Sequence, residues 1–295
     1  MSKLISVYEI YEHSLGVNTD SRSLQKGEVF IALKGENFNG NNFVEAAIDQ
    51  GAEAVICDEA QDFAHHKLFI VEDSLKFLQD LANYHRHQCS ATFIGITGSN
   101  GKTTTKELLR DVLSTTFKTH ATKGNFNNHI GVPLTLLEIK TDTEIAIIEM
   151  GANHQKEIEA LCEIAEPDYG YITNFGRAHL EGFGGVEGVI RGKTEMYRYL
   201  LGVGGERLIN PDDALQVQHA GPHAIPFLAD LHTWIESDGF VHIQRGTAQV
   251  KSHLSGAFQG TNLRAAWSLG THLGVSSEDI CSGIAAYVPS NNRGE

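Results

Sequence analysis

The sequence has few cysteines, and their placement excludes two classes of small stabilised domain. The four cysteines, Cys57, Cys89, Cys162 and Cys281, lie far apart and include no C-x-x-C pair. This spacing excludes a zinc ribbon and gives no sign of a disulfide framework. Scattered thiols are typical of a reducing compartment, so we expect a cytoplasmic protein.

Basic charge and long apolar runs are also lacking. The chain has 23 Lys and Arg against 37 Asp and Glu, a formal net charge of −14, whereas a general nucleic-acid binder needs a basic face. The apolar runs are far shorter than a membrane span, and the N-terminus lacks the pattern of a signal peptide. We therefore expect no nucleic-acid partner and no membrane insertion. The 295 residues, 41% of them hydrophobic, suffice for two globular domains.

The first part of the chain, residues 1–88, predicts a small mixed α/β domain. Three short apolar runs are typical of buried strands, and two segments between and after them have helical spacing. The strands are expected at 29–33, 54–57 and 68–71, and the helices at about 43–51 and 75–82.

The second part, residues 89–295, alternates strand and helix patterns. Strands are expected at 92–96, 145–149, 169–173 and 207–210, and helices at about 155–164 and 186–201. This alternation predicts a mostly parallel sheet flanked by helices, with ligands beyond the carboxyl ends of the strands. Antiparallel ribbons are expected between 221 and 258, and closing helices at 260–273 and 277–286.

The most informative segment, Gly98-Ser99-Asn100-Gly101-Lys102-Thr103-Thr104, follows a predicted strand and opens a predicted helix. Backbone N–H groups and the positive helix end would face one point there, which predicts a phosphate site. The lysine would contact the outer phosphates and the next hydroxyl would contact Mg²⁺. The spacing departs from the usual G-x-x-x-x-G-K-[ST] pattern, because its first glycine falls on Ile96. An ordinary glycine-rich turn with a solvated lysine is the weaker alternative.

Three ionisable residues could complete such a site. Glu149 ends a predicted strand, where a carboxylate suits Mg²⁺; a solvated glutamate is the alternative. Lys193 falls on the apolar stripe of its helix, so it either extends past that stripe to water or has a chemical reason to be buried, such as carbamylation by CO₂. His179, in a glycine-rich loop, could ligate a metal or could simply be solvated.

Several polar loops offer further contacts. Asn127 and Asn128 lie in the asparagine-rich segment 124–131, which could hold a carboxylate or a metal-bound water, or could be a plain turn. Arg22 and Lys34 are the candidate anion contacts of the first domain.

Taken together, these segments resemble the Mur ligases of bacterial peptidoglycan synthesis, in family order over nearly the whole chain. The asparagine-rich loop and the loop around His179 resemble the last ligase of that series. The matching segments are Asp20-Ser-Arg22, Gly27–Gly35, Thr97–Thr103, Gly124–Thr135, Glu149-Met-Gly-Ala-Asn153, Ala178–Gly184 and Gly192-Lys-Thr-Glu195.

The resemblance implies an ATP-dependent amide ligase that adds D-alanyl-D-alanine to UDP-N-acetylmuramoyl-tripeptide through an acyl phosphate, with ATP and Mg²⁺ as cofactors. Catalytic roles fall on Lys102, Lys193, His179 and Arg293, and metal contacts on Thr103, Glu149, His179 and a carbamylated Lys193. ATP contacts fall on Gly98, Ser99, Asn100, Gly101, Lys102, Thr103, Thr104, Gln259 and Asn262, and substrate contacts on Ser21, Arg22, Lys34, Asn127 and Asn128.

The chain departs from the family pattern in three places. Gln259 stands where asparagine is more usual, and Asn39-Gly40-Asn41 replaces Asp-Gly-His. The family's C-terminal Rossmann-like domain would begin where this chain stops. From that departure we expect substrate binding and weak ATP binding, with little or no ligation.

Other interpretations stay open at this point. They are the ligase that adds the third peptide residue and a non-catalytic module that binds ATP and the UDP-linked substrate. A third, folylpolyglutamate synthase, is disfavoured by the N-terminal domain with Asp20-Ser-Arg22. We expect a monomer, although the residues leave the oligomeric state open. They also leave open whether the tripeptide ends in diaminopimelate or lysine.

Overall fold

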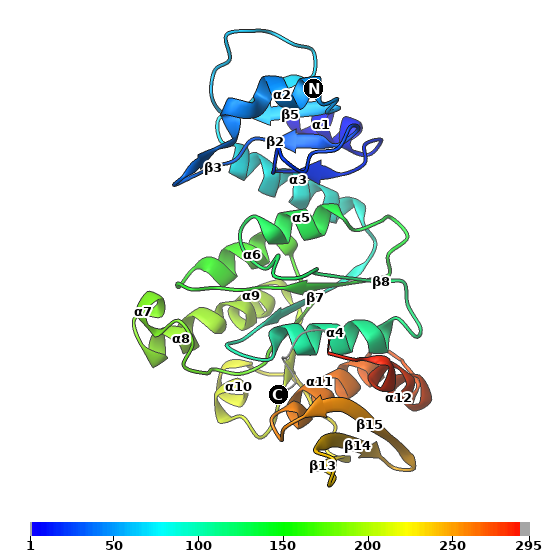
Figure 1. Ribbon diagram of the computed structural model, residues 1–295. Helices are drawn as coiled ribbons and strands as arrows, with labels where there is room; N and C mark the ends of the chain where they lie inside the picture. The colour runs from blue at the N-terminus through cyan, green and yellow to red at the C-terminus, as the bar shows by residue number, and fades with distance from the viewer. Residues whose placement is uncertain (1, 290–295) are drawn as a thin grey trace. The chain divides into compact units, whose positions relative to one another are not determined.

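The computed structural model describes residues 2–289 and divides them into two compact units. The first unit comprises residues 2–88 with 133–138, and the second comprises 89–132 with 139–289. Figure 1 labels the elements of each. Among the described residues, no helix combines the length and the apolar character that crossing a membrane requires.

The first unit contains a four-stranded parallel sheet in the order β1-β2-β5-β6. Its three predicted strands and two predicted helices are confirmed, whereas the first helix, the short edge strand β1 and the β3–β4 hairpin were not predicted. The elements are α1 Lys3–Tyr11, β1 Val17–Asn18, β2 Val29–Ile31, β3 Lys34–Gly35, β4 Phe38–Asn39, the 3-10 turn η1 Gly40–Phe43, α2 Val44–Asp49, β5 Ala54–Cys57, β6 Leu68–Ile70 and α3 Ser74–Gln88.

The second unit is built on a six-stranded sheet that is parallel throughout, in the order β12-β11-β10-β7-β9-β8. The predicted α/β class with a mostly parallel sheet is confirmed. The strands of this sheet are β7 Thr92–Thr97, β8 Thr119–Ala121, β9 Ile145–Glu149, β10 Tyr169–Ile172, β11 Glu206–Ile209 and β12 Ile225–Pro226.

Helices cover both faces of this sheet. The helix α4 (Lys102–Leu113) contacts α11 (Gln259–His272) and α12 (Ser277–Ala286), while α6 (Glu157–Ala165) contacts α9 (Glu195–Val203). The remaining helices are α5 Gly131–Leu137, which runs into the 133–138 segment of the first unit, α7 Leu180–Phe183, α8 Val186–Lys193 and α10 Ala214–His219.

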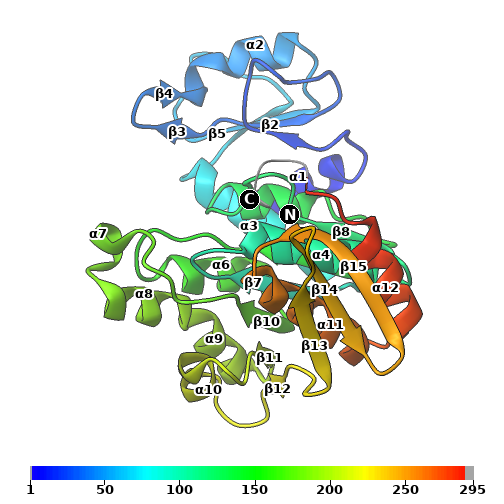
Figure 2. The ribbon, with the colours of Figure 1, turned by 60° about the horizontal axis from the view of Figure 1, so that its bottom comes forward.

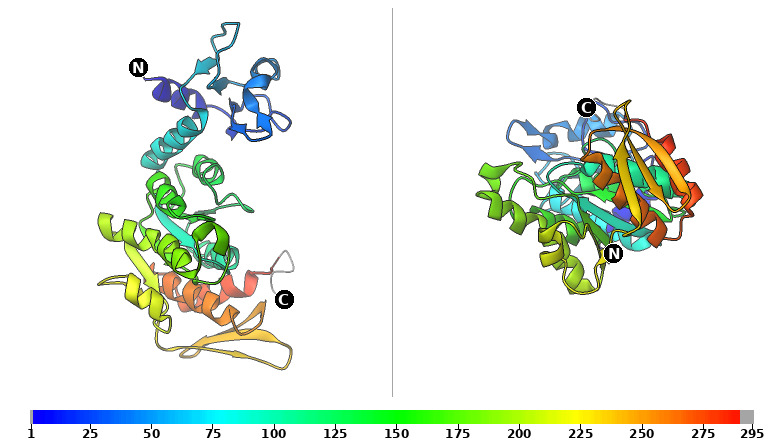
Figure 3. Two further views of the ribbon diagram at one scale, coloured as in Figure 1. Left: turned by 90° about the vertical axis from the view of Figure 1, so that its left-hand side faces the viewer. Right: turned by 90° about the horizontal axis from the view of Figure 1, so that it is seen from below.

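The predicted antiparallel ribbons form a three-stranded sheet. Its strands β13 (Leu231–Ile235), β14 (Phe240–Arg245) and β15 (Ala248–Ser255) pair antiparallel in that order. Figures 2 and 3 show this sheet lying beside α11 and α12.

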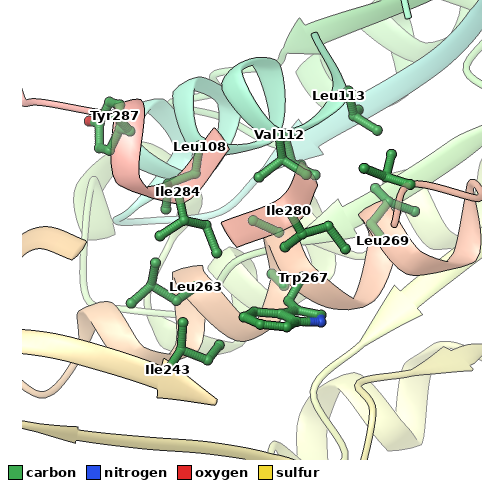
Figure 4. Close-up of a cluster of buried hydrophobic side chains, with 14 of the residues drawn as sticks. Leu108, Val112, Leu113, Ile243, Leu263, Trp267, Leu269, Ile280, Ile284 and Tyr287 are labelled. Carbon is green, nitrogen blue, oxygen red and sulfur yellow. The ribbon is translucent and has the colours of Figure 1, made fainter. Parts of the chain in front are cut away.

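The core between these elements explains their arrangement. Trp267 of α11 is completely buried, and it lies among apolar side chains from α4, α12 and β14, as Figure 4 shows. Burial of each large apolar side chain contributes about 1.5–3 kcal/mol, so this cluster fixes α4, the helix that begins at the glycine-rich segment.

The predicted single helix over 186–201 is wrong, because the chain forms two helices, α8 and α9, that meet at Thr194. The hydroxyl of Thr194 donates to the carbonyl oxygens of Ile190 and Arg191, and such a local bond competes with regular helix bonding. The break leaves Lys193 as the last residue of α8 and Glu195 as the first of α9.

Candidate functional site

The site is organised by the turn between β7 and α4, residues 98–103, which we call the phosphate loop. Two glycines of the loop have positive φ, +140° at Gly98 and +79° at Gly101, a region that side chains disfavour. A Cβ on Gly98 would lie 2.0 Å from the Thr173 hydroxyl oxygen. Gly101 is the N-cap of α4, so the free N–H groups of the first helical turn face the loop.

The loop is held by the residues that follow the neighbouring strand β10. The hydroxyl of Thr173 and the side-chain amide of Asn174 both donate to the carbonyl oxygen of Asn100. The Asn100 N–H donates to the Asn174 side chain, and the Ser99 hydroxyl donates to the carbonyl oxygen of Gly176. These hydrogen bonds therefore fix the backbone of the loop.

Lys102 folds back over this loop. Its Nζ donates to the carbonyl oxygens of Gly98 at 2.7 Å and Ser99 at 3.3 Å. Burial lowers the pKa of Lys102 below its usual range, and the Glu149 carboxylate opposes that shift. The ammonium thus lies at the loop, where it can exchange carbonyl partners for phosphate oxygens.

Glu149 lies at the carboxyl end of β9 and is almost fully buried, with 1% of its surface exposed. Its Oε1 accepts from the hydroxyl of Thr103 at 3.3 Å and from the side-chain amide of Asn127 at 2.8 Å. Its Oε2 is buried without a hydrogen-bond partner in residues 2–289, and lies 3.5 Å from Nζ of Lys106. A buried carboxylate with an unused oxygen beside a hydroxyl fits a hard cation such as Mg²⁺.

The structure also brings Lys193 close to the loop. The residue is 1% exposed, and its Nζ lies 3.4 Å from the Ala152 carbonyl oxygen and 5.3 Å from the Phe183 ring centroid. Burial is the main cause that lowers the pKa of Lys193 to about 8, and the Lys102 charge acts in the same direction. The carboxylates of Glu157 and Glu195 oppose the shift. The alternative in which Lys193 extends past the apolar stripe to water is excluded by this burial.

His179 is placed differently. It is exposed, adopts a left-handed backbone conformation with φ of 55°, and precedes α7. Within residues 2–289, no three His, Cys, Asp or Glu side chains gather as a metal-binding group. A metal contact of His179 stays a prediction.

On the other side of the loop, Gln259 and Asn262 tie α11 to α4. The Asn262 amide donates to Gln259 Oε1 at 2.7 Å, and the Thr105 hydroxyl donates to Asn262 Oδ1 at 3.1 Å. Asn262 also lies against Gly101, where a Cβ would come within 3.0 Å of its Oδ1. Thr104, which lies in α4, is buried as well. That Gln259 and Asn262 contact adenine stays a prediction.

The two asparagines of the 124–131 loop have separate partners. Asn127 contacts Glu149. Asn128 Oδ1 instead accepts from the N–H groups of Ile130 and Gly131 at the start of α5. Asn127 is therefore the member of the pair beside the proposed metal ligand.

The predicted anion contacts of the first unit are paired within the chain. Arg22, whose side chain is 85% exposed, bonds Asp20 through Nη2 and Oδ2 at 2.6 Å. That contact lowers the Asp20 pKa to about 2 and raises the Arg22 pKa. Lys34 bonds Glu59 at 2.7 Å, while Ser21 is buried. Exposed pairs contribute little stability, so both cations can exchange partners.

Sequence reasoning missed Lys106 and Asn174, whereas Thr173, the last residue of a predicted strand, was expected at the ligand-binding edge of the sheet. Lys106 falls on the inward face of α4 with Leu109 and Leu113, three and seven positions on, and that periodicity could have identified it. Asn174 carried no comparable signal, because its contact with the loop depends on strand order. Arg293, the predicted γ-phosphate contact, lies outside the described residues.

Comparison with protein families identifies this arrangement. Residues 96–270 match the model of the Mur ligase middle domain, and residues 13–86 match that of the Mur ligase family, catalytic domain. The first match contains the phosphate loop, Glu149 and Lys193.

Individual proteins of similar sequence or structure are also Mur ligases. The UDP-N-acetylmuramoyl-tripeptide–D-alanyl-D-alanine ligase of Bacillus subtilis is 37% identical over 295 residues, covering 96% of this chain and 64% of the relative. A crystal structure of MurF from Acinetobacter baumannii superposes with a TM-score of 0.85 at 32% identity, covering 97% of this chain and 68% of that one. The crystal structure of MurF from Thermotoga maritima in complex with ADP superposes with a TM-score of 0.82 at 28% identity, and the match covers 99% of this chain and 69% of that one. The chain thus spans about two thirds of the length of these relatives.

Proposed function

The chain belongs to the Mur ligase family, and we propose that it carries the ATP- and UDP-substrate-binding parts of a ligase that joins D-alanyl-D-alanine to UDP-N-acetylmuramoyl-tripeptide. The observation that carries this proposal is the phosphate loop, held by Thr173 and Asn174 beside buried Glu149. The names of the B. subtilis relative and of the ADP complex support the substrate and the nucleotide.

We assign ATP to residues 89–295 and the UDP-linked peptide to residues 1–88. Loop N–H groups and the α4 N-terminus hold the phosphates, and Lys102 exchanges the Gly98 and Ser99 carbonyl oxygens for phosphate oxygens. In the first unit, Arg22 and Lys34 exchange Asp20 and Glu59 for anionic groups of the substrate.

The reaction joins two anions, so its main requirement is charge neutralisation and alignment. An oxygen of the tripeptide carboxylate attacks the γ-phosphorus, the bond to the bridging oxygen breaks, and an acyl phosphate and ADP result. The D-alanyl-D-alanine amine then attacks the acyl carbon, and phosphate leaves. We assign neutralisation of the transferred group to Lys102, whose position at the Gly98 carbonyl oxygen supports that role.

Thr103 and Glu149 are the residues that would hold Mg²⁺, which when bound withdraws charge from phosphate oxygens. Asn127 orients the Glu149 carboxylate through its 2.8 Å bond. For Lys193, a pKa of about 8 leaves part of the amine neutral at physiological pH. The neutral nitrogen attacks CO₂ and loses a proton, giving a carbamate. A ¹³C resonance from ¹³CO₂ that disappears in Lys193→Met would support this step.

The compartment follows from the thiols. Within residues 2–289 none of the four cysteines forms a disulfide, and three of them are buried, which fits a reducing environment. We therefore place the reaction in the cytoplasm.

Calorimetry tests the substrate assignment on the chain as it stands. UDP-N-acetylmuramoyl-tripeptide is titrated into the parent chain and into Arg22→Gln, with the dipeptide form of the substrate as the comparison. We expect the tripeptide form to bind the parent more tightly, and Arg22→Gln to weaken both forms about equally. Absence of binding, or equal affinity for the two forms, would contradict the assignment.

A further inference from the structure

Lys106 is a buried ammonium that none of the roles above uses. It lies one turn after Lys102 in α4, and only 2% of its side chain is exposed. Its Nζ lies 3.5 Å from Glu149 Oε2, and the Glu149 side chain is equally buried. The pair therefore joins two charges that are both withdrawn from water.

This ion pair is a poor device for stability alone. Removing two charges from water costs several kcal/mol each, and the attraction offsets that cost only with good geometry and further hydrogen bonds. The hydrogen bonds to Glu149 reach Oε1 and leave Oε2 without one among residues 2–289. Oε2 therefore has charge compensation from Lys106 but keeps its lone pairs unused.

We propose that Lys106 is a positioning residue that holds Glu149 in its cation-binding position and sets how strongly the carboxylate attracts Mg²⁺. The ammonium balances the buried charge while the cation is absent, and its own charge then opposes the cation. This inference rests on the assignment of Mg²⁺ to Glu149 in the proposed function.

Two consequences distinguish this role from simple space filling. Without Lys106, the buried Glu149 carboxylate loses its ion-pair partner, so the chain loses stability in the absence of a divalent cation. The same anion attracts Mg²⁺ more strongly, because the repelling charge has gone. Loss of a nearby like charge in a partly buried site is expected to lower the Mg²⁺ concentration at the midpoint by about tenfold or more.

The test is thermal unfolding of the full chain over a series of MgCl₂ concentrations, with NaCl holding the ionic strength constant. The variants are Lys106→Met, Lys106→Arg and the double variant Lys106→Met/Glu149→Gln. Arg110→Met is the matched control, because it also removes a cation from α4, but at an exposed position.

Without Mg²⁺, we expect Lys106→Met to have a lower Tm than the parent. As MgCl₂ is added, the Tm of Lys106→Met should rise by more than that of the parent, and half of the rise should occur at a lower MgCl₂ concentration. Lys106→Arg and Arg110→Met should respond as the parent does. The double variant should regain much of the lost Tm and lose the enhanced Mg²⁺ response. If Lys106→Met fails to fold, a folded double variant still supports the charge pairing.

An equal Mg²⁺ response in Lys106→Met and the parent, or a double variant no more stable than Lys106→Met, would overturn the inference. The coupling between positions 106 and 149 is measured without metal or nucleotide. A parent chain that shows this coupling but binds no ATP therefore contradicts the proposed function and leaves the charge pairing intact.

Discussion

Gly98 determines whether the phosphate loop can keep its shape. Its backbone has a φ of +140°, and the nearest atoms to an added Cβ would be the hydroxyl oxygen and backbone N of Thr173, at 2.0 and 2.9 Å. The glycine and the threonine together place the loop carbonyls and N–H groups. Gly98 and the Thr173 hydroxyl thus contribute to the fixed shape of the loop, together with the bonds made by Asn174 and Ser99.

For Gly98→Ala we expect a loss of at least about 2 kcal/mol in the free energy of unfolding, because strain and overlap add. We also expect weaker nucleotide binding. Urea unfolding and calorimetry measure the two effects. Gly202→Ala is the control, since nothing lies within 4 Å of a Cβ there and alanine favours its helix. Equal stability of the two variants would contradict this account of the loop.

Lys193 should make stability depend on pH. Its pKa is lowered to about 8 from 10.5 in the folded chain, so the unfolded chain binds more protons between these values. The contribution of Lys193 to stability therefore rises as pH increases from about 8 to about 10.5, and is constant and unfavourable below.

Lys193→Met removes this dependence. We expect the variant to be more stable than the parent by a few kcal/mol near pH 7, and the difference to shrink toward zero above about pH 10. The difference in free energy of unfolding between Lys193→Met and the parent is measured by urea unfolding over a series of pH values at matched ionic strength. CO₂ is excluded so that the amine stays unmodified. A difference that stays constant with pH would show that the lysine does not titrate as described.

The break between α8 and α9 positions two buried residues near the site, because α8 ends at Lys193 and α9 begins at Glu195. It places Glu195, only 3% exposed, where its Oε1 accepts from the N–H of Lys156 at 2.7 Å and its Oε2 accepts from that of Glu159 at 3.1 Å. The first residue of α9 therefore caps the N-terminus of α6. One carboxylate thereby joins two helices next to Lys193.

Glu195→Ala should lower the free energy of unfolding by about 2–3 kcal/mol, since it leaves two N–H groups without their buried acceptor. Glu195→Gln keeps one acceptor and should lose less. Denaturant unfolding measures the free energies of unfolding of the parent, Glu195→Gln and Glu195→Ala, which we expect to decrease in that order. Glu187→Ala, at a side chain 89% exposed in α8, should change stability by under about 0.5 kcal/mol. A Glu195→Ala variant as stable as Glu187→Ala would exclude the capping role.

Most strands and helices were predictable, since each is a local pattern. The apolar runs of β7 and β9 and the stripe of α4 are visible in the sequence. The break at Thr194 was not, because it depends on a hydroxyl that bonds Ile190 and on a carboxylate used by α6.

The candidate site was predictable in its residue types more than in its contacts. Glycines, a lysine and a strand-end glutamate predict a phosphate and metal site. Which asparagine contacts Glu149, and that Lys106 is buried beside it, depend on side-chain packing between β9, α4 and the loop that follows β8.

Across the chain, a net charge of −14 coexists with a local cluster of cations. Lys102 and Lys193 are close enough for one to lower the pKa of the other, while Lys106 balances Glu149. Lys102 at the phosphate loop therefore offers a local cation for an anionic ligand, although the chain as a whole is acidic.

The most direct test of this account is calorimetric titration of the chain with a non-hydrolysable ATP analogue in MgCl₂. We expect saturable one-to-one binding that weakens about tenfold or more in Lys102→Met, because the ammonium bonded to the Gly98 carbonyl oxygen is lost. Lys118→Met, at an exposed pair with Asp142, should bind as the parent does. No binding by the parent, or equal binding by Lys102→Met, would contradict the claim that the phosphate loop holds a nucleoside triphosphate.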